Sequence, residues 1–169
     1  MLTFEFDSAR RCHVLRCEVT LTTDHETLFE FFSDAFQLEH LTPPFLHFKV
    51  QTRPPIQIEQ GTLIDYRLKL HGLPIRWRTE ISEWNPPFSF TDRQIRGPYR
   101  LWQHRHIFQP VTDGTLAIDE VLYKVPGGRT IERLIVRNDL RRIFDYRCRQ
   151  MIDRFGSADD RPDPLDTQT

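Results

Sequence analysis

Six segments in which polar and apolar residues alternate follow one another between residues 45 and 125, and a turn signal separates each from the next. Alternation with a period of two is the pattern of a half-buried strand, and short strands in such succession are typical of an antiparallel meander. A seventh alternating segment precedes them. The predicted strands are therefore 12–21, 45–53, 62–71, 75–84, 88–95, 99–108 and 115–125.

Helical spacing flanks the meander. Residues 23–32 and 34–41 predict two short helices ahead of it, and residues 129–155 carry an apolar stripe with the spacing of one long helix. A helix of that length would span about 40 Å, at about 1.5 Å of rise per residue. Only a large curved sheet can cover such a stripe, and a sheet wrapped around one helix encloses more volume than its side chains easily fill. We therefore expect a cavity between sheet and helix.

The predicted fold class is α+β in the order β-α-α-β6-α, a seven-stranded antiparallel sheet wrapped around a long C-terminal helix. The 169 residues suffice for a single domain with one substantial core, which we place at 1–155. Residues 156–169 are polar and contain two prolines, so we predict a disordered tail there.

Composition excludes several classes of function. The formal net charge is −1, and acidic residues are interspersed among the arginines of 129–155, so we expect no nucleic-acid partner. No apolar run approaches the roughly 20 residues of a membrane span, and we expect no signal peptide. The three cysteines form no C-x-x-C pair, which favours a reduced, cytoplasmic protein. No Gly-x-Gly-x-x-Gly motif follows a strand, and we predict no cofactor.

Two histidines alternate with two large aromatic residues on one face of the predicted strand 99–108. These residues are Trp102, His104, His106 and Phe108. Side chains two residues apart on a strand point the same way, and a solvated face would carry Lys or Glu at such positions. The face therefore either lines a cavity or belongs to a core in which the histidines find hydrogen-bond partners.

A turn signal at Asp113-Gly114 predicts how this strand pairs with the next. A two-residue loop there places His104 opposite Tyr123 and leaves Asp119 diagonal to His106. A histidine beside a carboxylate can act as an acid/base pair. The same pairing can equally satisfy buried polar atoms.

Asp92 is a further candidate for acid/base chemistry. It shares a strand face with Gln94, and whether that face points inward depends on the turn at 96–99, because a shift of one residue reverses every side chain. If Asp92 points inward, it becomes the best partner for His104 or His106.

The two histidines also raise the question of a metal. His-x-His on a strand is a two-ligand arrangement, and Asp119 could supply a third ligand. Zinc sites need three or four well-placed ligands with supporting hydrogen bonds, and the other histidines lie in separate elements without ligand-like spacing. We therefore predict no metal site.

Several motifs within residues 10–155 match those of a known superfamily. They are Leu41-Thr42-Pro43-Pro44-Phe45, His71-Gly72-x-Pro74-x-x-Trp77, Trp84-x-Pro86-Pro87-x-Phe90 and Gly97-Pro98-Tyr99-x-x-Trp102-x-His104-x-His106-x-Phe108. In them the chain resembles the START-like, helix-grip superfamily, also labelled SRPBCC, and a bacterial subgroup related to polyketide cyclases and lipid-transport-like proteins. The resemblance implies a helix-grip fold with an apolar cavity for lipids, polyketides, hormones or other hydrophobic molecules, and catalysis in only some branches.

Three functions are consistent with these patterns. The first is a non-enzymatic module that binds or carries a hydrophobic small molecule. Its predicted ligand contacts are Tyr66, Trp77, Trp102, His104, His106, Phe108 and Tyr123. The second is an enzyme of the cyclase or aromatase type, whose acid/base pair would come from His104, His106, Asp119 and Asp92. The third is an accessory domain for an epimerase-like protein partner, which the resemblance implies because some members of the subgroup occur beside epimerase-like dehydrogenases.

Overall fold

The computed structural model describes residues 1–158 and contains one antiparallel sheet of eight strands. The strands are β1 (Leu2–Asp7), β2 (Cys12–Leu21), β3 (Lys49–Val50), β4 (Leu63–Leu70), β5 (Leu73–Asn85), β6 (Ser89–Arg96), β7 (Leu101–Val111) and β8 (Gly114–Lys124). Their order across the sheet is β1-β2-β8-β7-β6-β5-β4-β3. Strands β3 to β8 therefore form the predicted meander, and β2 joins it beside β8.

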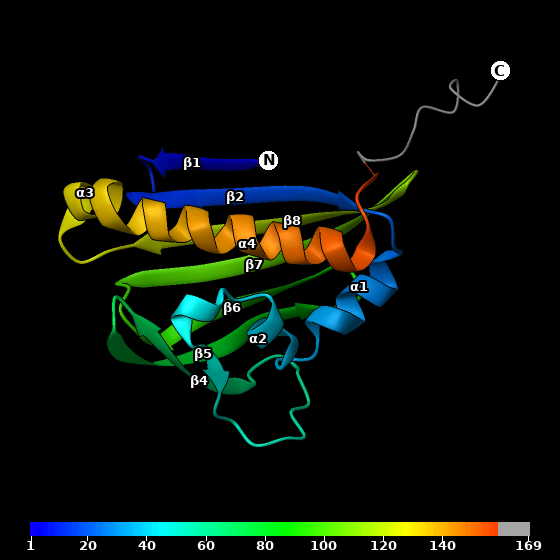
Figure 1. Cartoon of the computed structure of the whole chain (residues 1–169), viewed down its shortest axis with the longest axis horizontal. Coiled ribbons are helices and arrows are strands. Elements are labelled where there is room, and N and C mark those ends of the chain that lie inside the picture. Colours follow the sequence, from blue (N-terminus) through cyan, green and yellow to red (C-terminus); the bar gives the residue numbers. More distant parts are fainter. Residues whose placement is uncertain (159–169) are drawn as a thin grey trace.

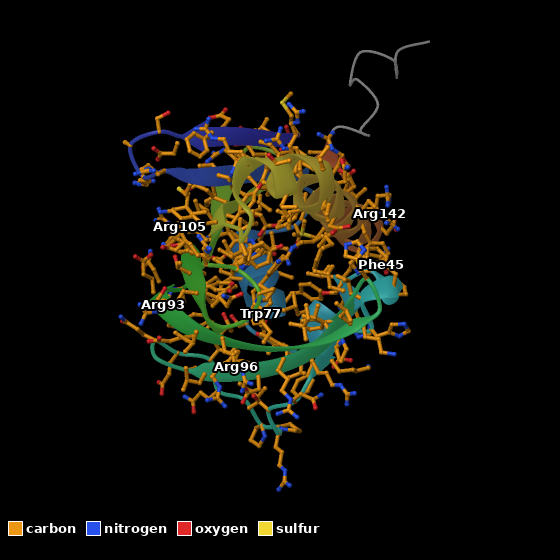
Figure 2. The ribbon with its side chains drawn as sticks, turned by 90° about the vertical axis from the view of Figure 1, so that its left-hand side faces the viewer. Phe45, Trp77, Arg93, Arg96, Arg105 and Arg142 are labelled. Atoms are coloured by element: carbon orange, nitrogen blue, oxygen red, sulfur yellow. The ribbon has the colours of Figure 1, made fainter. Side chains whose placement is uncertain are left out.

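Helices cover one face of this sheet. Between β2 and β3 lie α1 (His25–Phe32), α2 (Gln37–His40) and a 3-10 turn (Pro44–Leu46). After β8 come α3 (Gly128–Ile131), a π-helical segment (Glu132–Val136) and α4 (Arg137–Phe155), without a break between them. Helix α4 runs along β2, β8 and β7 (Figure 1), and the sheet curves around it toward β5 and β4 (Figure 2). The predicted α+β architecture, a curved sheet that grips a long C-terminal helix, is confirmed.

The sheet has one strand more than the predicted seven. β1 pairs with β2 along its whole length at the edge of the sheet. Leu2 and Phe4 of β1 pack against the hydrophobic cluster that contains Tyr123 and Leu140. In the sequence these apolar residues alternate with polar ones, and this alternation is typical of a strand.

Most of the predicted strand 45–53 is not a strand. Only Lys49–Val50 pairs with β4. The chain forms the 3-10 turn before it, and His47 has a positive φ of 44°. A residue in the left-handed region turns the backbone out of an extended path. The segment from α2 to β3 consequently packs against the open side of the curved sheet (Figure 2).

The β7–β8 hairpin is shifted by two residues from its predicted pairing, because His106 lies opposite Asp119 rather than Val121. Gly114 is the first residue of β8, not a turn residue. A Cβ atom on Gly114 would lie 2.0 Å from the carbonyl oxygen of Leu21, so the close approach of β2 requires glycine there. The shift is even, and every side chain therefore keeps its predicted face.

A buried carboxylate fastens the start of the long helix to the sheet. Glu132 is 1% exposed, and its Oε1 accepts hydrogen bonds from the Tyr123 hydroxyl at 2.8 Å and from Arg137 Nε at 3.0 Å. Its Oε2 accepts a third hydrogen bond from Arg137 at 3.1 Å and lies 3.7 Å from His13 Nδ1. We refer to Glu132 with these partners as the Glu132 anchor.

The start of the predicted tail contacts the end of β2. Thr22 donates its backbone N–H to the Gly156 carbonyl oxygen at 3.3 Å, and Ser157 forms an isolated bridge with Leu21. The rest of the predicted tail, 159–169, lies outside the described residues. Among residues 1–158, no helix is both long and apolar enough to cross a membrane.

The substitution Glu132→Gln should lower the free energy of unfolding by about 2 kcal/mol, because it removes a buried charge that accepts three hydrogen bonds. Urea unfolding followed by circular dichroism measures the change. Glu120→Gln on β8 is the matched control, because Glu120 pairs with Arg16 at a partly exposed surface and should change stability by about 0 to 1 kcal/mol. Equal losses in the two variants would contradict the anchor.

Candidate functional site

A cavity of about 160 Å³ lies between the sheet and α4. Strands β4 to β7, helix α4 and the segment from α2 to β3 form its wall. The apolar and aromatic residues of the wall are Leu38, Leu46, Phe48, Tyr66, Leu68, Leu70, Ile75, Trp77, Pro98, Tyr99, Trp102, Leu140, Ile143 and Phe144. The remaining ones are Thr42, Asp92, His104, His106 and Arg147. The expected cavity between sheet and helix is therefore present, and it is mostly apolar.

Three aromatic rings pack against one another in this wall. Trp77 of β5 and Trp102 of β7 meet edge to face with their centroids 5.4 Å apart, and Tyr99 lies 4.7 Å from Trp102. Gln94 holds the turn that carries Tyr99: its Nε2 donates to the Tyr99 carbonyl oxygen at 2.7 Å, and its Oε1 accepts from the Tyr99 backbone N–H at 3.2 Å. Gln94 thus supports the wall without lining the cavity.

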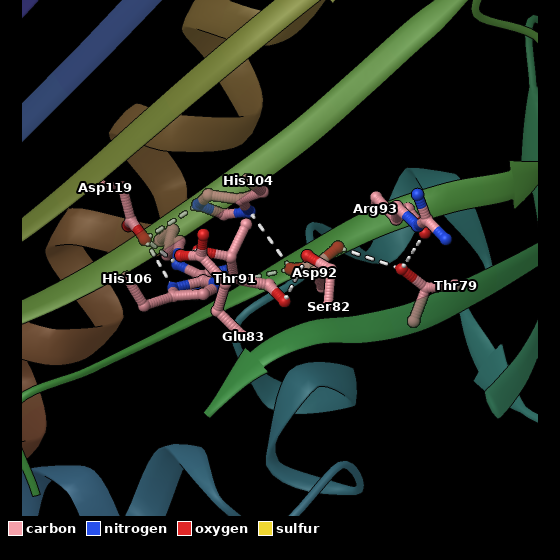
Figure 3. A network of polar contacts seen from close by, with 10 residues as sticks. Thr79, Ser82, Glu83, Thr91, Asp92, Arg93, His104, His106 and Asp119 are labelled. Carbon is pink, nitrogen blue, oxygen red and sulfur yellow. Dashed lines mark hydrogen bonds and ion pairs between the residues drawn. The ribbon is translucent and has the colours of Figure 1, made fainter. Parts of the chain in front are cut away.

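Two histidines of β7 lie between two aspartates (Figure 3). His104 Nε2 and His106 Nδ1 are both 2.8 Å from the same oxygen, Oδ1 of Asp119. On the other side, Oδ2 of Asp92 lies 3.2 Å from His106 Nε2 and 3.9 Å from His104 Nδ1. Arg147 of α4 places its Nε 3.1 Å from Oδ2 of Asp119. We call these five residues the polar cluster.

Strand register brings the cluster together. Asp92 of β6 lies opposite His104, and Asp119 of β8 lies opposite His106. Side chains directly opposite each other in an antiparallel pair are in contact range. Thr79 of β5 fixes Asp92 further, because its hydroxyl donates to Asp92 Oδ1 at 3.0 Å. Asp92 therefore points into the cavity, which settles the alternative that the sequence leaves open.

Burial and neighbouring charges shift the pKa values of the two histidines in opposite directions. Burial and the charge of His106 lower the pKa of His104 to about 4, so that His104 is neutral at neutral pH. Burial also favours a lower pKa for His106. However, the contacts of His106 with Asp119 and Asp92 outweigh burial and raise its pKa above the usual value. Of the two histidines, His106 therefore has the higher pKa.

Both aspartates of the cluster are ionised. Burial alone would raise the pKa of Asp119, but the charge of Arg147 and the two histidines lower it well below its usual value. Burial would also raise the pKa of Asp92, but the contacts with His106 and His104 outweigh it and lower that pKa. Both buried carboxylates are thus paired, Asp119 with Arg147 and the two histidines and Asp92 with the histidines, as buried charges require.

A cation–π contact holds the 3-10 turn beside helix α4. The guanidinium carbon of Arg142 lies 4.5 Å from the ring centroid of Phe45. Figure 2 shows these two side chains next to each other, away from the strands. Their contact joins α4 to the 3-10 turn, and Leu46 of that turn lines the cavity.

The cavity wall includes most, but not all, of the predicted ligand contacts. Tyr66, Trp77, Trp102, His104 and His106 line the cavity. Phe108 packs into the core, with its ring 5.9 Å from Phe29 and 5.1 Å from Phe32. The Tyr123 hydroxyl donates to Glu132. Phe108 and Tyr123 share the predicted strand face, but the cavity extends along only part of it, and they are not among the residues that line it.

Arg147 is missing from the predicted site residues, although the sequence carries a signal for it. It is 5% exposed, and it follows Phe144 by three residues and Ile143 by four, which places it on the apolar stripe of α4. A charged residue within an apolar stripe needs a buried partner. Asp119 is that partner.

The substitution Asp119→Asn should lower the free energy of unfolding by about 3 kcal/mol, because it leaves the Arg147 charge buried without its partner. Adding Arg147→Met should recover part of this loss, since no unpaired cation then remains on α4. Urea unfolding of the four proteins in the double-mutant cycle gives the coupling energy, expected at about 1 to 3 kcal/mol. Purely additive losses would refute the pairing.

Comparison with known proteins finds likeness in structure only. No protein-family model matches this chain, and no curated protein matches it in sequence. Among solved structures, the Zhui aromatase/cyclase from Streptomyces sp. R1128 matches with a TM-score of 0.66 and 11% identity, over 85% of this chain and 93% of that one. Major latex-like protein 151 from Panax ginseng matches with a TM-score of 0.63 and 12% identity, over 84% and 96%.

Protein CV1439 from Chromobacterium violaceum matches with a TM-score of 0.67 and 13% identity, over 89% of this chain and 98% of that one. Identities this low establish likeness of fold and nothing finer. The fold nevertheless agrees with the resemblance that the motifs carry. The chain therefore has the START-like, helix-grip fold that it shares with an aromatase/cyclase and a latex-like protein.

Proposed function

We propose that this protein binds a small hydrophobic molecule with one polar group in the cavity between the sheet and α4. The observation that carries the proposal is the wall itself, which is apolar except for Thr42 and the four residues of the polar cluster that reach it. Ligand sites commonly combine a mostly apolar lining with a few polar groups that set the orientation of the ligand.

The volume of the cavity limits the size of the ligand. About 160 Å³ is close to the engineered cavity of about 150 Å³ that binds benzene in another protein. A single aromatic ring, or an aliphatic group of similar size, therefore fills it. A larger ligand has to displace part of the wall. The 3-10 turn, held by the contact between Phe45 and Arg142, is a part of the wall that lies outside the strands of the sheet.

His104 offers such a ligand a hydrogen-bond acceptor. Its Nε2 lies 2.8 Å from Asp119, and this partner assigns the proton of the neutral ring to Nε2. Nδ1 then keeps its lone pair, and His104 lines the cavity. A ligand hydroxyl can donate to that atom, whereas a hydrocarbon ligand would leave it unpaired at a cost in free energy.

Phenol should bind about tenfold more tightly than toluene, since the phenol hydroxyl adds one hydrogen bond to Nδ1 of His104. Calorimetric titration of the full chain in the presence of EDTA measures both affinities. His104→Phe should abolish the preference and retain toluene binding. His71→Phe, at an exposed histidine that pairs with Asp139, should leave the preference intact. Absence of saturable binding of either probe would overturn the proposal.

The polar cluster also favours a second candidate, an enzyme of the cyclase or aromatase type. His104 Nδ1 and the Asp92 carboxylate lie 3.9 Å apart in one cavity wall, so two groups that can exchange protons with a substrate are adjacent. One structure with this fold is an aromatase/cyclase. Ring closure with loss of water needs such proton transfers.

A synthetic linear poly-β-ketone thioester tests this second candidate, with the cyclised product followed by liquid chromatography and mass spectrometry. The protein should accelerate product formation over the spontaneous reaction. His104→Phe and Asp92→Asn should each remove the acceleration. An unchanged rate in both variants, or no acceleration by the original chain, would exclude this assignment.

The epimerase-like protein partner stays a prediction. The cytoplasmic location stays a prediction as well.

A further inference from the structure

Asp92, His104 and His106 direct one donor atom each toward a common point on the cavity wall. Asp92 Oδ2 is 3.2 Å from His106 Nε2 and 3.9 Å from His104 Nδ1, and one donor atom of each residue lies within 4.8 Å of the others. Zinc bonds to nitrogen of about 2.0 to 2.1 Å place neighbouring tetrahedral donors about 3.3 Å apart. The three donors are thus close to the spacing that a metal ion needs.

The opposite nitrogens of both histidines share one acceptor. His104 Nε2 and His106 Nδ1 each lie 2.8 Å from Asp119 Oδ1. Metal-binding histidines usually donate their second ring N–H to a carboxylate or carbonyl, which fixes the ring and the tautomer. A metal binds neutral imidazole rings, and in that form, with one N–H of each ring donating to Asp119, the lone pairs of His104 Nδ1 and His106 Nε2 face Asp92. This supporting hydrogen-bond layer is what the sequence alone does not reveal.

Arg147 decides on which side of the histidines a cation can bind. Its Nε is 3.1 Å from Asp119 Oδ2, and its guanidinium also lies 3.4 Å from His106 Nδ1. A fixed positive charge there repels a metal ion from the Asp119 side. Asp92, in contrast, lines the cavity, and Asp119 does not. The Asp92 side is accessible from the cavity, and there the charged group next to the histidine nitrogens is a carboxylate.

Thr79 sets how Asp92 would bind. Its hydroxyl lies 3.0 Å from Asp92 Oδ1 and also 3.0 Å from the Arg93 carbonyl oxygen, and the contact with Oδ1 leaves Oδ2 of Asp92 next to the histidines. Oδ2 remains for the metal, so Asp92 would act as a one-oxygen ligand. Two imidazole nitrogens with one carboxylate oxygen form a ligand set that zinc and iron(II) use with coordination positions left open.

We propose that Asp92, His104 and His106 bind a divalent first-row transition-metal ion of the zinc or iron(II) class, and that Asp119 is a positioning residue for both histidines. All three ligands line the cavity, so the open coordination positions face the space where the hydrophobic ligand is proposed to bind. The metal would take an oxygen of that ligand. This inference goes beyond the proposed function, which is tested with EDTA present.

Cobalt(II) is the probe, because its d–d absorption reports the number and type of ligands. The full chain, without an affinity tag and freed of metal with EDTA, should bind one equivalent of Co²⁺ with d–d bands and without a thiolate charge-transfer band. His104→Phe and His106→Phe should abolish these bands. Asp92→Asn, which preserves shape, should weaken binding at least tenfold, and His71→Phe should leave it unchanged. Circular dichroism and thermal unfolding check that each variant is folded.

Proton NMR of the cobalt-bound protein separates this site from other arrangements. Two exchangeable, hyperfine-shifted N–H signals should appear, one from His104 Nε2 and one from His106 Nδ1. Asp119→Asn should reduce Co²⁺ affinity about 10- to 100-fold and shift both signals. A purely structural effect of Asp119 would lower stability without moving those signals.

Three results would overturn the proposal. The first is a Co²⁺ dissociation constant above about 1 mM for the original chain, with Zn²⁺ equally weak. The second is Co²⁺ binding that persists in folded His106→Phe or Asp92→Asn with unchanged affinity. The third is a spectrum that disappears in Cys17→Ser, because Cys17 and Cys148 lie 2.7 Å apart between their sulfur atoms and form the competing thiol pair. None of these outcomes bears on phenol binding in EDTA.

Discussion

The ion pair between Arg147 and Asp119 is the interaction on which the rest of the structure depends. It joins the long helix to strand β8, and both side chains are buried. Burying two charges costs desolvation free energy, which their attraction offsets only when the remaining polar atoms also find partners. His104 and His106 are those partners for Asp119. The carboxylate of Asp119 therefore fixes both the position of the helix on the sheet and the orientation of the two histidines.

Two anchors hold the long helix, and the cavity lies between them. Glu132 fastens the start of the helical segment through Tyr123, and Arg147 fastens its middle through Asp119. The helix residues that line the cavity, among them Leu140 and Phe144, fall between these two points in the sequence. Unfilled space costs stability because its lining loses contacts. Between the anchors, Leu140 and Phe144 pack against residues of β2 and β8 and also line the cavity, so the anchored helix forms one wall of it.

The hairpin between β7 and β8 shows what the sequence predicts about strand pairing and what it does not. Alternation alone places His104 and His106 on one face, and the structure agrees. The turn signal at Asp113-Gly114 predicts a pairing that is two residues away from the observed one. Gly114 lies in β8 and not in the turn, and glycine is required there because the carbonyl oxygen of Leu21, far away in the sequence, comes close to it. In the observed pairing Asp119 lies directly opposite His106. The histidines line the cavity and Asp119 does not.

By itself, the sequence determined the types and order of most elements, apart from β1 and the 3-10 turn, and the faces that side chains share, because periods of 2 and 3.6 residues are local properties of the chain. It also singled out Asp92, His104 and His106 as candidates. Only the tertiary structure decided which aspartate faces the cavity, that Phe108 and Tyr123 belong to other clusters, and that Arg147 completes the site. These outcomes depend on strand register and helix–sheet packing, contacts between distant residues whose energies a local pattern does not contain.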